Sequence, residues 1–365
     1  MAEERVLVIE GDADLAALVS LAALPGIAPK KVWALVDDRS PSVAWSEVRA
    51  GGRTLGRASG EWADWARSVD PAEVLGAHRR HGVRVVPYGA SGYPSRLLDD
   101  PEPPAVLFTQ GPSMVDERVA IAIVGTRRCT RYGTDIAREL GGVLAERGIL
   151  VVSGLAHGID AAAHAGAGRA DPACCVAVVA GGVDAVYPAN NRGLWHAVAR
   201  SGLLLSEWPL GASARPWRFP ARNRLVAALS VAVVVVESGV RGGSMYTVDE
   251  ALQRDRVVFA VPGSIRSPSS FGTNRLIAEG ATLLDDIAAF ADALAPRPRE
   301  TVQTTLALGD PESSWLLDLI GWEPATVEQV LAASDKTATE VTIEIEMLLA
   351  DGRLARSGSR LERLQ

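Results

Sequence analysis

Cysteine is scarce in this chain, and the other residues that hold metals do not cluster. Only three cysteines occur among 365 residues, at Cys129, Cys174 and Cys175, and none forms a C-x-x-C pair. The five histidines include His78 and His81, without a neighbouring group of carboxylates or cysteines. We therefore expect no metal site. The adjacent pair Cys174 and Cys175 begins an apolar run, which favours buried core over a redox role.

Long apolar runs are missing as well. The longest, residues 225–236, is shorter than the ~18–20 residues that a membrane-spanning helix needs, and Ser230 interrupts it. The N-terminal stretch MAEERVLVIEGDADL is acidic and lacks the basic and apolar regions of a signal peptide. We expect no membrane association and a cytoplasmic location. With 48% hydrophobic and 22% charged residues, the composition is that of a globular protein of two or three domains.

Lysine is also rare, because only three of the 37 basic residues are lysines. The net charge of −7 at first argues against nucleic acid, but the charges are unevenly distributed. Residues 301–365 contain eleven acidic and five basic residues, which is nearly the whole acidic excess. Residues 191–224 contain six arginines and one acid, Glu207. Since the planar fork of arginine suits phosphate binding and base stacking, the central part of the chain is the candidate for an anionic ligand.

Common catalytic and cofactor motifs are absent too. No lysine follows a glycine as a Walker A loop requires, and the first strand is not followed by G-x-G-x-x-G. Neither a G-x-S-x-G elbow nor an H-E-x-x-H motif occurs. We expect no cofactor and no catalytic residue, so the sequence favours a protein that is not an enzyme.

Six short apolar runs alternate with helical stretches between residues 80 and 290. Uninterrupted runs of this length mark strands buried on both faces, and the helix-length gaps indicate parallel crossovers. The pattern predicts an α/β fold with a Rossmann-like, doubly wound, mostly parallel sheet, whose ligands lie beyond the carboxyl ends of the strands. The runs are 119–124, 149–153, 175–180, 203–207, 231–237 and 256–262.

The flanking regions predict two smaller domains. Residues 20–36 contain two helical patterns joined at Pro25-Gly26, as in a helix-hairpin-helix (SAM-like) unit that binds phosphate or as in a plain helical turn. After residue 306, three short helices and a two-stranded ribbon around Gly358 suggest a winged-helix-like domain, whose acidic third helix suits protein contact at least as well as DNA. We divide the chain into an N-terminal helical domain (1–75), an extended Rossmann-like DNA-binding domain (76–295), a linker (296–306) and the winged-helix-like domain (307–365).

Glycines, arginines and small polar residues follow the predicted strands. The first strand runs into Gly125-Thr126-Arg127-Arg128 and a helix, which offers N–H groups and a helix dipole to an anion, although a tight turn with surface arginines is the alternative. After the second strand, Asp160 either caps a helix or pairs with His164 as acid and base. Similar residues recur at 187–192, 219–224, 242–244, 262–264 and 272–274. Together they predict a long anion-binding rim, with Phe219 and Tyr187 as rings for base stacking or as core.

These motifs, in order, resemble the DNA-processing protein A family (DprA, also called Smf). The likeness covers about 200 residues and begins with GYPSRLLDDPEPPAVLFTQG at 92–111. It continues through IAIVGTRRCTRYG, VVSGLAHGIDAAAH, VVAGGVDAVYPANN, LLSEWP, FPARNRLVAALS, VVVVES, AVPGSI and GTNRLIAEGA. One departure is Gly-Gly-Ser at 242–244, where we expect Ser-Gly before the hydroxyl residue, and this puts the role of Ser244 in doubt.

The resemblance implies a non-enzymatic protein that binds and protects incoming single-stranded DNA during natural transformation and loads the RecA recombinase onto it. It also implies a homodimer formed through the central domain. With the rim residues added, the predicted phosphate- and nucleic-acid-binding positions are Gly125, Thr126, Arg127, Arg128, Ser153, Gly154, Gly158, Arg192, Phe219, Arg222, Asn223, Arg224, Gly263, Ser264 and Asn274. We expect the arginines among them to be exposed.

Two other functions stay open at this point. Rossmann-like sheets with glycine turns also occur in nucleotide-cleaving phosphoribohydrolases, with Glu207 or Asp160 as the acid or base. Those enzymes carry P-G-G-x-G-T, of which Pro262-Gly263-Ser264 is only a fragment. A scaffold that binds small nucleotides as signals is the second alternative.

Overall fold

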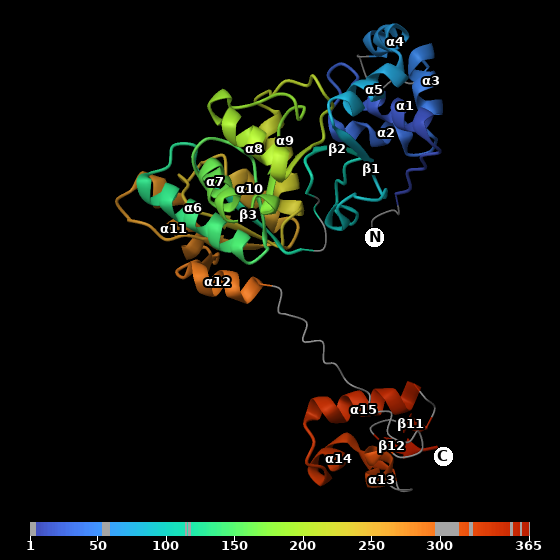
Figure 1. Ribbon diagram of the computed structural model, residues 1–365, viewed down its shortest axis with the longest axis vertical. Coiled ribbons are helices and arrows are strands. Elements are labelled where there is room, and N and C mark those ends of the chain that lie inside the picture. The colour runs from blue at the N-terminus through green and yellow to red at the C-terminus, as the bar shows by residue number, and fades with distance from the viewer. Residues whose placement is uncertain are drawn as a thin grey trace. The chain divides into compact units, whose positions relative to one another are not determined.

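The computed structural model describes residues 5–52, 59–113, 115, 118–295, 314–320, 324–350, 353–357 and 360–364. The chain forms two compact units, residues 1–296 and 297–365 (Figure 1). The linker predicted at 296–306 and the ribbon turn at Gly358 lie outside the described residues. None of the helices within those ranges has the length and apolar character of a membrane-spanning segment.

The first unit begins with a group of short helices. Two of them start where the sequence places a capping residue before proline: Ser40 accepts a hydrogen bond at the start of α3, and Asp70 accepts one at the start of α5. Helix α5 continues past the boundary predicted at residue 75, so the helical part reaches Arg80. The helices are α1 (Asp12–Ala22), α2 (Trp33–Val36), α3 (Pro41–Ala50), α4 (Ser59–Ser68) and α5 (Pro71–Arg80).

Nine strands of the described chain form one sheet in the order β1-β2-β6-β5-β4-β3-β7-β8-β9. Strands β3 to β9 are parallel, and β1 and β2 pair antiparallel at one edge. Each of the six predicted runs contains one parallel strand, which confirms the predicted fold class. The strands are β1 (Arg84–Pro87), β2 (Val106–Gln110), β3 (Ala120–Val124), β4 (Leu150–Ser153), β5 (Cys175–Val178), β6 (Leu203–Ser206), β7 (Ala232–Val235), β8 (Val257–Ala260) and β9 (Thr282–Leu283).

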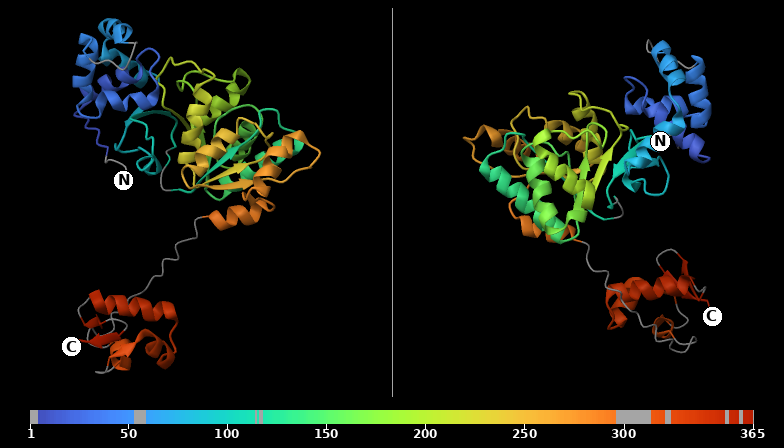
Figure 2. Two further views of the ribbon diagram at one scale, coloured as in Figure 1. Left: turned by 180° about the vertical axis from the view of Figure 1, so that it is seen from behind. Right: turned by 45° about the horizontal axis from the view of Figure 1, so that its top comes forward.

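Helices cover both faces of this sheet (Figures 1 and 2). On one face α6 packs against α7 and α12, and α7 packs against α8; α9 and α10 pack against each other on the opposite face. The chain winds in one direction from β3 to β6 and in the other from β7 onward, and right-handed crossovers place the two sets on different faces. The helices are α6 (Arg131–Glu146), α7 (Ile159–Ala170), α8 (Arg192–Ser201), α9 (Arg218–Ala228), α10 (Met245–Leu252), α11 (Phe271–Ala278) and α12 (Ile287–Leu294).

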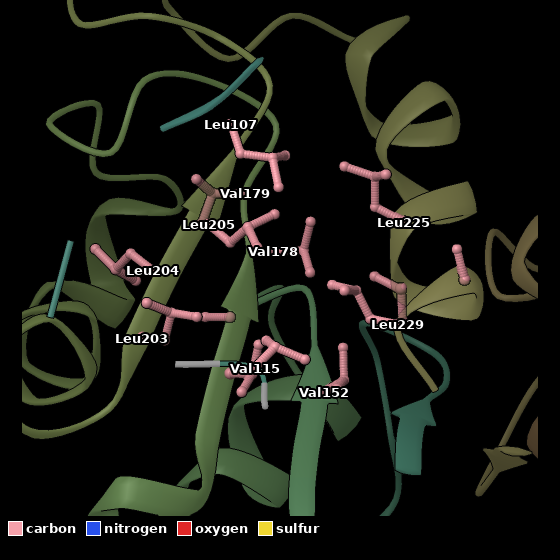
Figure 3. Packing of buried hydrophobic residues seen from close by; sticks show 14 of the residues in the cluster. Leu107, Val115, Val152, Val178, Val179, Leu203, Leu204, Leu205, Leu225 and Leu229 are labelled. Carbon is pink, nitrogen blue, oxygen red and sulfur yellow. The ribbon is translucent and has the colours of Figure 1, made fainter. Parts of the chain in front are cut away.

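Aliphatic side chains fill the space between sheet and helices. In Figure 3, Leu225 and Leu229 of α9 point toward side chains of the strands, among them Val178 and Val152. The buried cluster continues without a break from the N-terminal helices to the sheet, so the division between the first two predicted domains stays a prediction. Cys174 and Cys175 are both buried, as predicted.

The second unit has its own small core. Three helices, α13 (Trp315–Ile320), α14 (Val327–Ala333) and α15 (Ala338–Ala350), pack with a sheet of β10 (Ala325–Thr326), β12 (Arg360–Arg363) and β11 (Leu354–Ser357). The three helices and the hairpin agree with the sequence pattern. Its assignment as a winged helix stays a prediction.

Helices α6 and α7 approach each other closely because glycines lie at their contact. A Cβ at Gly166 would overlap the carbonyl oxygen of Arg138, and one at Gly141 would overlap that of Ala163. Gly142, on the same helix pair, is different, because a Cβ there would lie 3.7 Å from the carbonyl oxygen of Gly166, an ordinary contact. The packing therefore requires glycine at two of these positions and tolerates a methyl group at the third.

We predict opposite effects for two glycine-to-alanine substitutions in this helix pair. Gly166→Ala should lower the free energy of unfolding by about 1–3 kcal/mol, because the helices must separate to admit the methyl group. Gly142→Ala should leave it unchanged or raise it by up to about 1 kcal/mol, since alanine favours a helix. Urea unfolding followed by circular dichroism measures both, and equal effects of the two substitutions would contradict the packing argument.

Candidate nucleic-acid interface

The strand order of the sheet reverses between β3 and β7. The chain places β4, β5 and β6 on one side of β3 and then returns to place β7 and β8 on the other side. Ligands of such sheets bind beyond the carboxyl ends of the strands at this switch point, where the loops diverge. A pocket of about 610 Å³ lies there, between the loops after β3 and β4, helix α9 and the start of α10.

Eight of the fifteen predicted site residues line this pocket, which brings distant parts of the chain together. Those eight are Gly125, Thr126, Arg127, Arg128, Gly154, Phe219, Arg222 and Asn223. Tyr187, which we named as a possible stacking ring, and Ser244, whose role the sequence left in doubt, line it as well. The Ser244 hydroxyl is turned inward and donates to the Ser238 hydroxyl at 2.8 Å.

A carboxylate of the protein itself occupies the start of helix α6. Glu237 follows β7, is 1% exposed, and accepts hydrogen bonds from the backbone N–H of Thr130 at 2.8 Å and from its hydroxyl at 2.6 Å. Thr130 in turn caps α6. Glu237 thus faces the positive end of the helix dipole, where we expected an external anion, and the binding of an anion by the residues of this loop stays a prediction.

Asp160 fills the turn after β4 in the same way. One of its carboxylate oxygens accepts the N–H groups of Gly154 at 3.1 Å and Ala156 at 3.4 Å. The residue that caps α7 is Gly158, not Asp160 as we predicted, and the helix begins at Ile159. Burial raises the pKa of Asp160, and the positive charge of Arg222 opposes this shift. Several backbone N–H groups of the two glycine turns, those of Thr126, Thr130, Gly154 and Ala156, are thus used inside the protein.

The alternative that Asp160 and His164 pair as acid and base is not supported by an accessible site. His164 is completely buried, and neither ring nitrogen has a hydrogen-bond partner among the described residues. Burial lowers the pKa of His164 to about 4, so the ring is neutral at pH 7. Glu207, the other candidate acid or base, is 3% exposed and forms an ion pair with Arg224. No group of three or more metal-ligating side chains occurs in the described part of the chain.

An arginine and two aromatic rings are stacked at the mouth of the pocket. The exposed side chain of Arg127 places its Cζ 4.9 Å from the ring centre of Phe219. The rings of Phe219 and Tyr187 have centres 5.2 Å apart and planes inclined by 50°. Tyr187 is 45% exposed and Phe219 is half-buried, so the rings are accessible rather than pure core. This arrangement joins a cation and flat surfaces, as single-stranded nucleic acid requires.

Arg222 is buried, contrary to our expectation of an exposed side chain. It is 4% exposed, and its guanidinium donates to the carbonyl oxygen of Val178. Burial lowers the pKa of Arg222 to about 10, although the nearby carboxylate of Asp160 raises it, so the side chain stays charged at pH 7. The guanidinium lies so close to Gly154 that a Cβ there would overlap it. Arg222 therefore places a fixed positive charge in the pocket floor.

The remaining seven predicted positions do not line the pocket. Ser153 donates its hydroxyl to Ile123 at 2.6 Å, and Asn274 holds the backbone of Gly263 through both amide atoms, at 3.1 and 2.9 Å. Their polar groups serve the fold, as does the ion pair of Arg224. Gly158 lies in the left-handed region (φ 79°) against the carbonyl oxygen of Thr126. Arg192 and Ser264 are exposed elsewhere, and their contact with DNA stays a prediction.

Sequence reasoning missed two kinds of residue. Tyr246 and Thr247, at the start of α10, line the pocket but follow no motif that marks them. Glu237 was detectable in principle. It ends the predicted run 231–237, so it lies at the carboxyl edge of the sheet, beside the loops that follow the neighbouring strands. Its partner, the start of α6, becomes visible only when β7 is known to lie beside β3.

The sequence model of the DNA recombination-mediator protein A family matches residues 84–295 of this chain. DNA processing protein DprA of Bacillus subtilis is 38% identical over 233 residues, which cover 64% of this chain and 77% of that protein. Protein Smf of Escherichia coli is 32% identical over 283 residues, covering 74% and 75%.

Solved structures agree with these matches. The structure of DNA processing protein A from Streptococcus pneumoniae superposes with a TM-score of 0.63 at 27% identity, covering 80% of this chain and all of that one. DNA processing protein A from Helicobacter pylori, solved for insight into its single-stranded DNA binding mode, gives a TM-score of 0.53 at 30% identity and covers 58% and 95%. The chain therefore belongs to the DNA recombination-mediator protein A family, whose members are named DprA or Smf.

Proposed function

We propose that this protein binds single-stranded DNA at the switch-point pocket, protects it, and loads the RecA recombinase onto it during natural transformation or recombination. The observation that carries the proposal is the stack of Arg127, Phe219 and Tyr187 over a pocket floor that contains the charged Arg222. Phosphates would contact the arginines, and bases would stack on the rings without sequence preference. The proposed role is binding in the cytoplasm rather than catalysis.

The charge of the pocket and the similarity to a solved relative support this proposal. Three arginines and one acid, Asp160, line the pocket, so its local charge is positive although the chain carries −7. Glu237 and Asp160 accept the backbone N–H groups of Thr130, Gly154 and Ala156, so the arginine side chains supply the positive charge for the phosphate contacts. The relative from Helicobacter pylori is described as a protein that binds single-stranded DNA.

We predict that Arg127→Ala weakens binding to all single strands alike. The loss should be about 1–3 kcal/mol, the range of a charge-assisted contact, and the salt slope should fall by about 0.7, because phosphate contacts carry no base information. Fluorescence anisotropy with labelled strands of several sequences and salt concentrations measures both. Arg222→Ala is the less informative variant, since loss of this buried side chain also lowers stability.

The matched control is Arg169→Ala, at the exposed last turn of α7 and outside the pocket. It should bind as the wild type does, and both variants should keep the thermal midpoint, because exposed arginines contribute little to folding. Normal binding by Arg127→Ala would place the DNA elsewhere.

The proposal includes a homodimer formed through the edge of the sheet at β9. This edge strand pairs only with β8 among the described strands, and it leaves Leu283 44% exposed. The segment after β8 exposes Ile265 at 83% and Phe271 at 43%. An open edge with apolar side chains is the kind of surface that pairs with a second copy.

We predict that light scattering of the full chain gives twice the monomer mass of 38.4 kDa. Ile265→Asp should shift the particle toward the monomer, because a charge would be buried at the contact. Val43→Asp, at a 49% exposed position on α3, is the control and should stay dimeric. A wild-type monomer at micromolar concentration would remove this part of the proposal.

RecA loading draws its support from the family, whose description is that of a recombination mediator. We assign the acidic second unit to protein contact rather than to DNA, since residues 301–365 contain eleven acids against five basic residues. Negative charge on that scale repels phosphates.

Removal of residues 297–365 should therefore leave the affinity for single-stranded DNA within a few fold. A loss of DNA affinity of about a hundredfold, or 2.7 kcal/mol, on truncation would show that the second unit binds DNA after all.

RecA loading is tested separately. On strands coated with single-strand-binding protein, the full chain should accelerate the onset of ATP hydrolysis by RecA.

A further inference from the structure

A second pocket adjoins the one at the switch point. It has a volume of about 380 Å³ and lies between α9, the start of α10 and the residues around Lys30 that precede α2. Pro220 and Tyr246 line both pockets, so the two are continuous across these side chains. Both volumes fall within the range of about 300–1,000 Å³ that is typical of ligand sites.

An exposed aromatic ring is held rigidly at this second pocket. Trp217 is 46% exposed, although the guanidinium of Arg218 lies over it with Cζ 5.2 Å from the ring centre. The same guanidinium lies 5.3 Å from the ring centre of the buried Trp208 and donates to the carbonyl oxygen of Ser213 at 2.9 Å. Trp217 is thus fixed before any ligand arrives, which reduces the entropy cost of stacking on it. Tyr246, 57% exposed, adds a second ring.

The charges of the second pocket differ from those of the first. Three carboxylates and two cations line it, whereas the first pocket has three arginines and one carboxylate. Glu207 and Arg224 neutralise each other in a buried pair. The carboxylate of Glu102 has no hydrogen bond in the described structure, but its two oxygens form ion pairs with Lys30 at 3.5 Å and with Arg224 at 3.9 Å. One carboxylate oxygen of Glu250 accepts a hydrogen bond from the guanidinium of Arg254 at 2.5 Å, which leaves the other oxygen as an acceptor for a ligand.

This chemistry suits a base and disfavours a phosphate. Free carboxylate oxygens accept hydrogen bonds from the exocyclic amino groups of cytosine and adenine and from the N–H groups of guanine. Thymine presents carbonyl oxygens on two sides of its single N–H group and is repelled by the same carboxylates. Flat exposed rings beside such acceptors are typical of sites that hold unpaired bases.

We propose that the pocket lined by Trp217, Tyr246 and Glu250 is a second nucleotide subsite, which takes an unpaired base that carries an amino group. The inference rests on the proposed binding of single-stranded DNA, and it extends the path of the strand from the phosphate-binding pocket across Tyr246 toward Lys30. The first pocket is indifferent to base identity, and the second gives the protein a modest preference for cytosine over thymine.

The test uses the full chain and labelled strands of about 20 nucleotides, longer than common single-strand site sizes of about 4–16. The strands are oligo(dC), oligo(dT) and a strand of the same length without bases. Trp217→Ala should weaken binding to oligo(dC) about tenfold, which lies within the range found for stacking of one base on an aromatic ring. Trp217→Phe, which keeps a ring, should retain affinity within about threefold of the wild type. Neither variant should change binding of the strand without bases.

Base preference is tested separately with Glu250→Gln. This change should reduce the ratio of oligo(dC) to oligo(dT) affinity by about threefold to tenfold, the range of one hydrogen bond. Glu279→Gln is the matched control, because Glu279 also forms an ion pair with an arginine four residues away, Arg275, but lies outside both pockets.

The outcomes separate this inference from the proposed function. If the wild type binds no single strand, the proposed function fails and the subsite with it. If the wild type binds but Trp217→Ala binds every strand as tightly as the wild type does, only the subsite is overturned. The same holds if Trp217→Ala loses as much affinity for the strand without bases as for oligo(dC). An unchanged base ratio in Glu250→Gln would overturn the preference for amino-bearing bases.

Discussion

The hydrogen bonds between Glu237 and Thr130 fix the point at which this sheet changes direction. They join the end of β7 to the start of α6, and so they hold the loop after β3 between two neighbouring strands. A further hydrogen bond connects the loops after β3 and β7, because the N–H of Thr126 donates to the carbonyl oxygen of Glu237 at 2.7 Å. The carboxylate places a negative charge of the protein itself at this helix start, and the exposed side chains of Arg127 and Arg128 add positive charge to the loop beside it.

A buried charge pair has a corresponding role at the floor of the pocket. Burial disfavours the charged form of both Arg222 and Asp160, and their opposite charges offset only part of that cost. Asp160 also holds the turn after β4, so the same carboxylate shapes the loop and balances the arginine. Glycine at position 154 leaves room for the guanidinium, which a Cβ there would overlap. This glycine turn thus allows close packing around a fixed cation.

The sequence was most informative where one physical requirement dominates. Strands buried on both faces must be apolar throughout, so the six parallel strands next to the centre of the sheet were predictable from short apolar runs. Strand β1 and the two-residue β9 lie at the edges, where partial exposure weakens that signal, and they were missed. Strand β2, next to β1, was also missed although it is mostly buried. The site was predictable as a set of loops at one sheet edge. Burial within it was not, because the exposure of Arg222 or Arg224 depends on which loop packs against it, and motif spacing carries no such information.

The protein also shows how an acidic chain is suited to bind an anionic polymer. Screening limits the reach of an exposed charge to about 8 Å at physiological ionic strength, so the side chains that line a pocket decide its potential. Acids are concentrated in residues 301–365 and arginines in residues 191–224. Within the first unit the sorting is finer, since Arg127 and Arg128 are exposed while Asp160 and Glu237 are buried and accept hydrogen bonds from the protein's own N–H and hydroxyl groups. A strand approaching the switch point therefore meets the cations first, and the net charge of the chain does not decide whether it binds.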